Sequence, residues 1–182
     1  MKFKLIIGYI ALFTLASNWV FGQDSWKIDS TRLVFYISNA GLDVEGSMTG
    51  ITAQIKFSKN KLDRSLFVAE AKPETIHTGI KLRDKHLKKA DYFDIEKYPT
   101  IKIESKKIIQ SKNGFDAYCA ITLKGQTKEI VIPFMFKQTN RKAEFKGTFS
   151  LNRLDFGLGE KSIVLSDTVK IDIWAGTSRG TN

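Results

Sequence analysis

Few side chains of the kind that carry out enzyme chemistry occur in this sequence. Among its 182 residues there are two histidines, His77 and His86, and one cysteine, Cys119. A zinc site needs three or four clustered ligands, and two histidines with one cysteine do not supply such a set. Cys119 lies in an alternating apolar segment without an activating partner nearby, so we expect it in the core. We predict no catalytic residue, no metal site and no cofactor, and therefore no enzyme.

The charge of the chain favours an anionic partner. There are 29 Lys and Arg residues against 19 Asp and Glu residues, which gives a net charge of +10 at pH 7, and such an excess attracts anions over long range. Five basic residues lie between Lys81 and Lys89. They are not interleaved with aromatic residues, so nucleic acid is not an expected partner. Either this segment binds anionic membrane head groups, or its charges face solvent.

The first 22 residues have the features of a secretory signal peptide. Lys2 and Lys4 give a basic start, and residues 5–15 are mostly apolar. This apolar stretch is shorter than the roughly 20 residues of a membrane-spanning helix. We therefore predict cleavage near Gly22, a mature domain over residues 23–182, and a periplasmic or secreted location.

Most of the remaining chain alternates between apolar and polar residues with a period of two. Side chains along a β-strand point to opposite faces in turn, so this pattern predicts strands with one apolar and one polar face. We expect about eight strands in a single domain, because no linker or internal repeat divides the chain. The segments that alternate most clearly are 33–37, 51–57, 115–123, 130–136, 143–151 and 169–173.

Short turns separate the predicted strands. Asn113-Gly114 is a strong hairpin signal, and Gly125 marks a second turn. Strands joined by such short turns pair antiparallel. One segment departs from the pattern: residues 78–97 have helix-like apolar spacing and Pro99 follows them, which predicts a short helix and a loop inserted between strands.

The predicted fold class is all-β, with one antiparallel sheet whose apolar face must be covered. The sheet can pack against another as a sandwich or close into a barrel, and a barrel of about eight strands is filled by side chains or holds one small ligand. The apolar face combines many phenylalanines with small residues such as Gly147 and Ala117. This combination fits both a filled core and a cavity, and the alternation itself leaves the two open.

Several blocks of the chain, in order, resemble the YceI-like family of bacterial periplasmic proteins. The central block is Arg83-Asp84-x-His86-Leu87, followed by Asp91-Tyr92-Phe93-Asp94 and Tyr98-Pro99-x-Ile101. The others are Trp26-x-Ile28-Asp29, Val44-Glu45-Gly46, Thr75-Ile76-x-Thr78-Gly79, Leu123-Lys124-Gly125-x-Thr127-Lys128 and Asn152-Arg153-x-Asp155-Phe156-Gly157. One departure is that Ser30-Thr31-Arg32 stands where the family usually has a His-Ser pair, so no role of that histidine is carried over.

The resemblance implies a lipocalin-like antiparallel barrel whose apolar lumen holds a long amphiphile. The implied ligands are a polyisoprenoid, an isoprenoid pyrophosphate or a quinone-like lipid, held for transport, storage or stress protection. The tail is then expected to contact apolar side chains that point inward. Our candidates for these lumen contacts are Phe35, Ile55, Phe57, Phe115, Ile121, Phe134, Phe149 and Ile171.

A polar head group is expected at the mouth of such a barrel. A guanidinium presents donors that suit a diphosphate, and the candidate mouth residues are Arg83, His86, Phe93, Arg153 and Phe156. The alternative is that Arg83 with Asp84, and Arg153 with Asp155, form structural ion pairs. Transient membrane contact and a homodimer are both compatible with a barrel that has an apolar lip.

Overall fold

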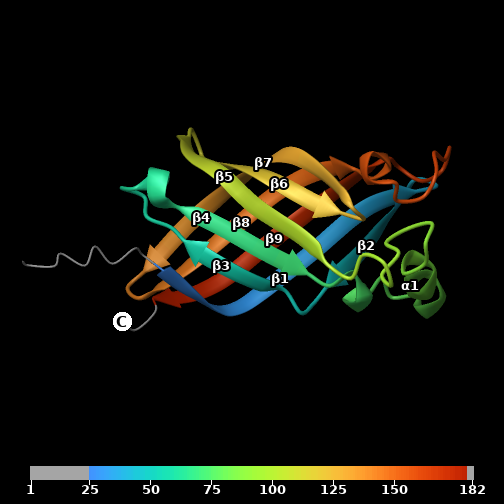
Figure 1. Cartoon of the computed structure of the whole chain (residues 1–182), viewed down its shortest axis with the longest axis horizontal. Coiled ribbons are helices and arrows are strands. Elements are labelled where there is room, and N and C mark those ends of the chain that lie inside the picture. The colour runs from blue at the N-terminus through green and yellow to red at the C-terminus, as the bar shows by residue number, and fades with distance from the viewer. Residues whose placement is uncertain (1–24, 180–182) are drawn as a thin grey trace, which may run out of the picture.

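The structure of the chain is a computed structural model that describes residues 25–179. Within this range a nine-stranded antiparallel sheet closes on itself, which confirms the predicted all-β barrel (Figure 1). The predicted signal peptide lies outside the described residues. The strands are β1 (Ser25–Asn39), β2 (Leu42–Met48), β3 (Thr52–Lys56), β4 (Leu66–Ala71), β5 (Ile101–Ser111), β6 (Gly114–Leu123), β7 (Gln126–Thr139), β8 (Lys142–Asn152) and β9 (Thr168–Arg179).

The long first strand closes the barrel because it pairs on both of its edges. One edge of β1 pairs with β9, from Trp26 opposite Arg179 to Tyr36 opposite Lys170. The other edge pairs first with β3 and then with β2. Eight strands thus form the closed wall, and β2 extends it at one end.

Two-residue turns set the register of consecutive strands. Ala40 and Gly41 join β1 to β2 with φ angles of 51° and 80°, and Lys124 and Gly125 join β6 to β7 with φ angles of 48° and 73°. Two successive residues with positive φ suit a tight hairpin, because the backbone of such a turn matches the twist of the paired strands. With the register fixed, side chains alternate between the interior and the outside, except that register shifts at Ile28/Ser30 in β1 and at Ser105/Lys107 in β5 move the alternation by one residue.

Aromatic side chains close one end of the barrel. Phe57 is fully buried at their centre, with ring centroids 4.8 Å from Phe136 and 5.1 Å from Phe115. Most of these rings meet edge to face or tilted, the arrangements that aromatic pairs prefer. We call this cluster the aromatic floor; it consists of Trp26, Phe57, Phe67, Phe115, Phe134, Phe136 and Phe145.

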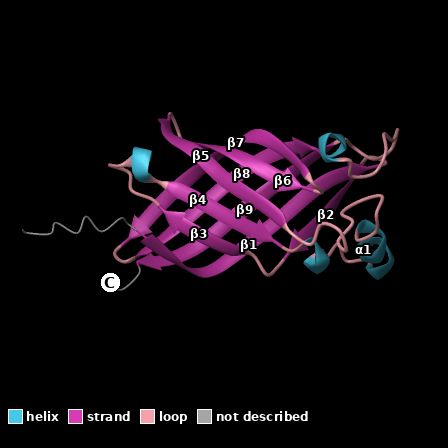
Figure 2. Cartoon of the chain, viewed as in Figure 1, coloured by secondary structure: helices cyan, strands magenta, loops and turns pink. Residues whose placement is uncertain are grey.

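The opposite end, which we call the mouth, carries most of the helical segments. The helix α1 (Lys81–Leu87) and the 3-10 turns η2 (Pro73–Thr75) and η3 (Arg153–Phe156) lie there, whereas η1 (Leu62–Arg64) lies at the floor end (Figure 2). The short helix predicted within residues 78–97 is therefore α1. No helix within residues 25–179 combines the length and the apolar character that a membrane span requires.

Candidate functional site: an apolar cavity inside the barrel

A cavity of about 400 Å³ lies inside the barrel between the aromatic floor and the mouth. This volume falls within the range of small-molecule sites. Its wall is almost wholly apolar, and β9 alone contributes side chains from Val169 to Ala175. At a rise of about 3.3 Å per residue and a strand tilt near 40°, those six steps correspond to a depth of roughly 15 Å along the barrel axis. The space is therefore elongated and blind at the floor.

Small residues at inward positions create this space. Ala53, Ala69, Ala117 and Ala175 all line the cavity, and so does Gly147, which faces inward between Phe145 and Phe149 on β8. A well-packed interior has few voids larger than a water molecule, so small side chains beside large ones leave a hollow only where no neighbour fills it. The sequence did not decide between a filled core and a cavity. The structure contains a cavity.

Most of the predicted lumen residues are on the cavity wall, but two are not. Phe35, Ile55, Ile121, Phe134, Phe149 and Ile171 line the cavity. Phe57 and Phe115 instead lie within the aromatic floor and are absent from the wall. On the strands that carry these residues, the alternation identified the inward face, but it carries no information about depth along the barrel axis.

The predicted mouth residues divide in the same way. Arg83, His86, Phe93 and Arg153 border the cavity, and His86 also contacts the ring of Tyr92 edge to face at 5.0 Å. Phe156 is 2% exposed and packs with Ile121, Leu123 and Leu158 in a second apolar cluster beside the cavity. Phe156 therefore packs against residues of the cavity wall and does not itself line the cavity.

Arg83 is held at the mouth through one edge of its guanidinium. Its Nε donates to Oγ1 of Thr78 at 2.7 Å, and its Nη2 donates to the Thr78 carbonyl at 2.6 Å. Among the hydrogen bonds of the described residues, none uses Nη1 of Arg83. This nitrogen, on a residue that lines the cavity, is the donor most available to a ligand oxygen.

The same threonine organises an acidic residue. Oγ1 and the backbone N–H of Thr78 donate to Oδ1 of Asp84, at 2.5 Å and 2.8 Å, and Nδ1 of His77 lies 3.4 Å from Oδ2. The hydroxyl hydrogen bond favours the ionised carboxylate and lowers the pKa of Asp84. The alternative of an Arg83–Asp84 ion pair is therefore wrong: both side chains bind Thr78, and the ionisable side chain beside Asp84 is His77.

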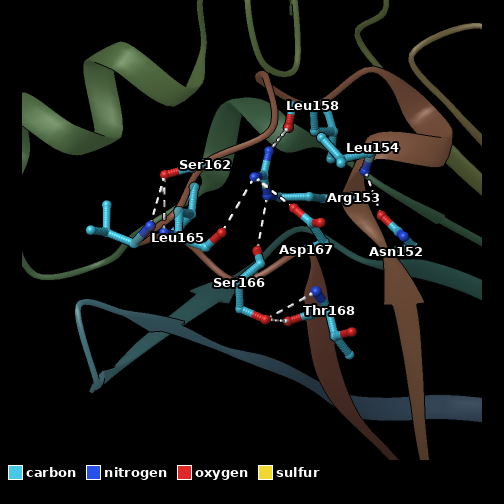
Figure 3. A network of polar contacts seen from close by, with 10 residues as sticks. Asn152, Arg153, Leu154, Leu158, Ser162, Leu165, Ser166, Asp167 and Thr168 are labelled. Carbon is cyan, nitrogen blue, oxygen red and sulfur yellow. Dashed lines mark hydrogen bonds and ion pairs between the residues drawn. The ribbon is translucent and has the colours of Figure 1, made fainter.

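The guanidinium nitrogens of Arg153 all bind other groups of the protein (Figure 3). It is 3% exposed, and its Nε and Nη1 donate to the carbonyls of Ser166 and Leu158, both at 2.9 Å. Nη2 lies 3.0 Å from Oδ1 of Asp167. The ion pair expected with Asp155 is therefore wrong in its partner. The buried guanidinium of Arg153, in η3, thus binds Asp167, which lies fourteen positions later and just before β9. No local sequence motif indicates this contact.

Among the described residues, the two potential nucleophiles Cys119 and Ser178 hydrogen-bond to Ala117 and Asp29, and neither hydrogen-bonds to a histidine. Burial raises the pKa of Cys119 to about 11, so this cavity-lining thiol is protonated at neutral pH. The segment Gly176-x-Ser178-x-Gly180 has the spacing of a hydrolase elbow. Ser178, however, lies in β9 at the floor end and donates to Asp29, whereas both histidines lie at the mouth.

Comparison with known proteins gives consistent relatives. A protein from Pseudomonas savastanoi pv. phaseolicola named "UPF0312 protein" is 31% identical over 147 residues, which is 76% of each chain. A Vibrio cholerae protein that is also named a UPF0312 protein is 27% identical over 132 residues, which is 68% of this chain and 70% of the relative. Both matches extend over most of the barrel.

Solved structures share the fold. The Burkholderia cenocepacia protein BcnA matches with a TM-score of 0.79 at 20% identity, over 82% of this chain and 99% of its own. A polyisoprenoid-binding domain from Saccharophagus degradans matches with a TM-score of 0.64 at 12% identity, over 86% of this chain and 98% of its own. The family model for the YceI-like domain matches residues 26–175. By this match and by the 31% identity to the Pseudomonas relative, the chain belongs to the YceI-like family.

Proposed function

We propose that this protein binds one long-chain lipid, with the tail in the barrel and the head group at the mouth. The candidate ligands are a polyisoprenoid, an isoprenoid pyrophosphate or a quinone-like lipid. The observation that carries the proposal is the elongated apolar cavity, which ends blindly at the aromatic floor and meets Arg83 and His86 at its other end. Such a site has one apolar end and one polar end, as an amphiphile does.

Burial of the tail supplies the affinity. Each CH₂ group removed from water contributes roughly 0.8 kcal/mol, so about ten buried groups contribute roughly 8 kcal/mol. Association itself costs an estimated 4–15 kcal/mol, roughly the same size. Short chains are therefore held weakly, and a long chain that fills the cavity is favoured.

The head group is expected to contact Arg83 and not Arg153. Nη1 of Arg83 is available beside the cavity, whereas the donors of Arg153 bind carbonyls and Asp167. A phosphate oxygen at Arg83 forms a charge-assisted hydrogen bond, which is stronger than a neutral one. The name of the Saccharophagus degradans domain, polyisoprenoid binding, supports an isoprenoid tail as the first ligand to test.

The place of action is also part of the proposal. The signal-peptide features of residues 1–22 favour export, so the barrel is expected to work in the periplasm or outside the cell. In an aqueous compartment a free isoprenoid exposes its whole tail to water. A binding protein that shields the tail suits transport, storage or protection of the lipid, without any catalytic step.

Extraction of the purified protein tests this function. Organic extraction and mass spectrometry are expected to release a long-chain lipid, and delipidated protein is expected to take up an added polyprenol. In Ala69→Phe, a ring enters the cavity, so uptake is expected to fall at least tenfold. The matched control is Ala120→Phe, because Ala120 lies on β6 between two inward-facing residues and points to the outside of the barrel.

The result depends on both variants remaining folded, which circular dichroism and thermal melting establish. Protein that yields no lipid and takes up neither polyprenol nor quinone would overturn the proposal. Equal uptake by Ala69→Phe and Ala120→Phe would show that any bound lipid lies outside the barrel. For the head group, Arg83→Met is expected to weaken binding of a prenyl pyrophosphate more than that of the corresponding alcohol.

A further inference from the structure

Large apolar side chains are exposed around the mouth on three separate elements. Leu82 of α1 is 79% exposed, and Ile163, in the loop between η3 and β9, is fully exposed. A single exposed apolar residue is ordinary, whereas a group bordering one opening indicates an interaction surface. We call this group the rim, and it consists of Leu42, Ile80, Leu82, Ile163 and Val164.

Backbone contacts bring the rim elements to one opening. The N–H of Ala40, in the β1–β2 turn, donates to the carbonyl of Val164 at 2.7 Å, so Leu42 and Val164 lie on adjoining segments. On the other edge of β2, Ser47 and His77 exchange two backbone hydrogen bonds, which anchor the segment leading into α1. Figure 1 shows α1 and the loop after η3 projecting beyond the strands at the same end.

The cavity opens among these elements. Its lining includes Arg83, His86 and Leu87 of α1, Val44 of β2, and Leu165 of the loop. The rim residue Leu82 is adjacent to Arg83 in α1, but it is exposed and does not line the cavity. The helix therefore turns one face toward the cavity and presents Leu82 to the surroundings.

Positive charge accompanies the apolar rim. Lys81, Lys85 and Lys89 are exposed on α1 and just after it, and Lys88 is half-buried. The acidic residue within α1 is Asp84, which is buried against Thr78 and so does not cancel the charge of the outer face. Exposed apolar tips beside lysines are the combination that binds the interface of an anionic bilayer.

We propose that the rim docks this protein on the surface of an anionic lipid bilayer. The apolar tips enter the interfacial layer, the lysines contact anionic head groups, and the cavity opening faces the bilayer. This inference rests on the proposed lipid-binding function, because docking in this orientation lets a tail pass between bilayer and cavity without crossing water. The proposed partner is the lipid surface and not a second protein.

Sedimentation with lipid vesicles tests the docking surface. Wild-type protein is expected to bind vesicles of phosphatidylcholine with 30% phosphatidylglycerol (a chosen composition), to bind pure phosphatidylcholine weakly, and to leave the anionic vesicles as salt is raised, because salt screens surface charge. The double variant Leu82→Ser with Ile163→Ser is expected to lose at least tenfold in binding. Its control is Val131→Ser with Met135→Ser, which removes two exposed apolar side chains from the outer wall at β7.

A second pair of variants isolates the charge. Lys85→Gln with Lys89→Gln is expected to weaken binding to anionic vesicles about tenfold, whereas Lys137→Gln with Lys142→Gln, near the turn at the floor end, leaves it unchanged. Absent vesicle binding would overturn the proposal, and so would equal losses in the rim variants and their controls. Dimers that dissociate on rim substitution, without vesicle binding, would instead assign the rim to contact between two copies.

Lipid extraction keeps this inference separable from the proposed function. Rim variants are expected to retain the cavity lipid that they carry when purified, because the cavity wall is unchanged. Protein that binds anionic vesicles but never contains or accepts a lipid would refute the cavity function and leave the docking surface standing. Protein that accepts a polyprenol from solution but ignores vesicles would refute docking alone.

Discussion

The ring of Phe35 occupies the space that a side chain on Gly46 would take. The two residues are paired across β1 and β2, and three ring carbons of Phe35 lie within 2.8 Å of the position that a β-carbon on Gly46 would take. Phe35 also lines the cavity. Because Gly46 has no side chain, this ring can pack against β2 and is not displaced into the cavity.

Replacing Gly46 by alanine is expected to reduce the lipid capacity of the barrel. The new methyl group displaces the Phe35 ring toward the cavity, because the ring can swing more easily than the paired backbone can move. We expect destabilisation by about 1–3 kcal/mol from the crowding and a loss of polyprenol affinity of about tenfold, which is roughly 1.4 kcal/mol. Titration with a fluorescent polyprenol analogue measures the affinity. The double variant Gly46→Ala with Phe35→Leu is expected to recover binding, and failure to recover would contradict the steric explanation.

Shortening Phe57 is expected to deepen the cavity and to weaken the fold. Phe57 is fully buried and touches five other rings of the aromatic floor. Phe57→Ala is expected to lower the free energy of unfolding by about 3–5 kcal/mol and to shift the preferred ligand toward longer chains. Urea denaturation and a binding series of alkyl chains measure the two effects. Tyr118→Ala, at an exposed position on β6, serves as control, and an unchanged chain-length preference in Phe57→Ala would argue that the floor does not limit the ligand.

Loss of the Arg153 guanidinium is expected to destabilise the protein strongly. Arg153→Met leaves the buried Leu158 carbonyl and the half-buried Ser166 carbonyl without these donors and removes the ion pair with Asp167. We expect a decrease of about 3 kcal/mol in the free energy of unfolding. Arg64→Met removes an exposed contact of 3.9 Å with Asp63 and is expected to cost less than about 1 kcal/mol. Similar losses in the two variants, measured by urea denaturation, would count against a structural role for Arg153.

Asp84 is expected to contribute to stability in a way that depends on pH. Its pKa is lowered in the folded state by the Thr78 hydroxyl, so its stabilisation is complete above the unfolded pKa of about 3.9 and is lost as the pH falls through the lower folded value. In Thr78→Val the hydroxyl donor is absent, so the pKa of Asp84 is expected to rise and acid unfolding to begin at higher pH. Carboxyl-carbon NMR and circular dichroism between pH 2 and 6 measure both changes. Thr78→Ser retains the hydroxyl, and a pKa that rises equally in this variant would contradict the assignment.

The strand pattern was predictable because alternation and turn chemistry are local. The segments around Phe115 and Phe149 alternate cleanly, and Asn113-Gly114 lies at the turn between β5 and β6 as expected. The strand β4 was not recognised, since Leu66-Phe67-Val68-Ala69 is a continuous apolar run that carries no period. Its place in the wall depends on pairing with β3 and β5.

The features of the site that escaped prediction all depend on contacts between distant segments. The sequence places Phe57 on an inward face, but its position in the floor follows from rings on β4, β6, β7 and β8. The sequence offers Asp155, two positions away, as an ion-pair partner of Arg153, whereas the folded chain brings Arg153 to Asp167. Closure of the barrel, and with it the cavity, requires the pairing of β1 with β9, which are separated by almost the whole chain.

The first and last described residues, Ser25 and Arg179, both lie at the floor end of the barrel, away from the mouth (Figure 1). A fluorescent reporter, an affinity handle or a solid support joined directly before Ser25 or directly after Arg179 is thus kept apart from the opening by the length of the cylinder. Immobilised molecules of this kind present their entrances outward in a common orientation, which suits the protein for lipid capture on a sensor surface.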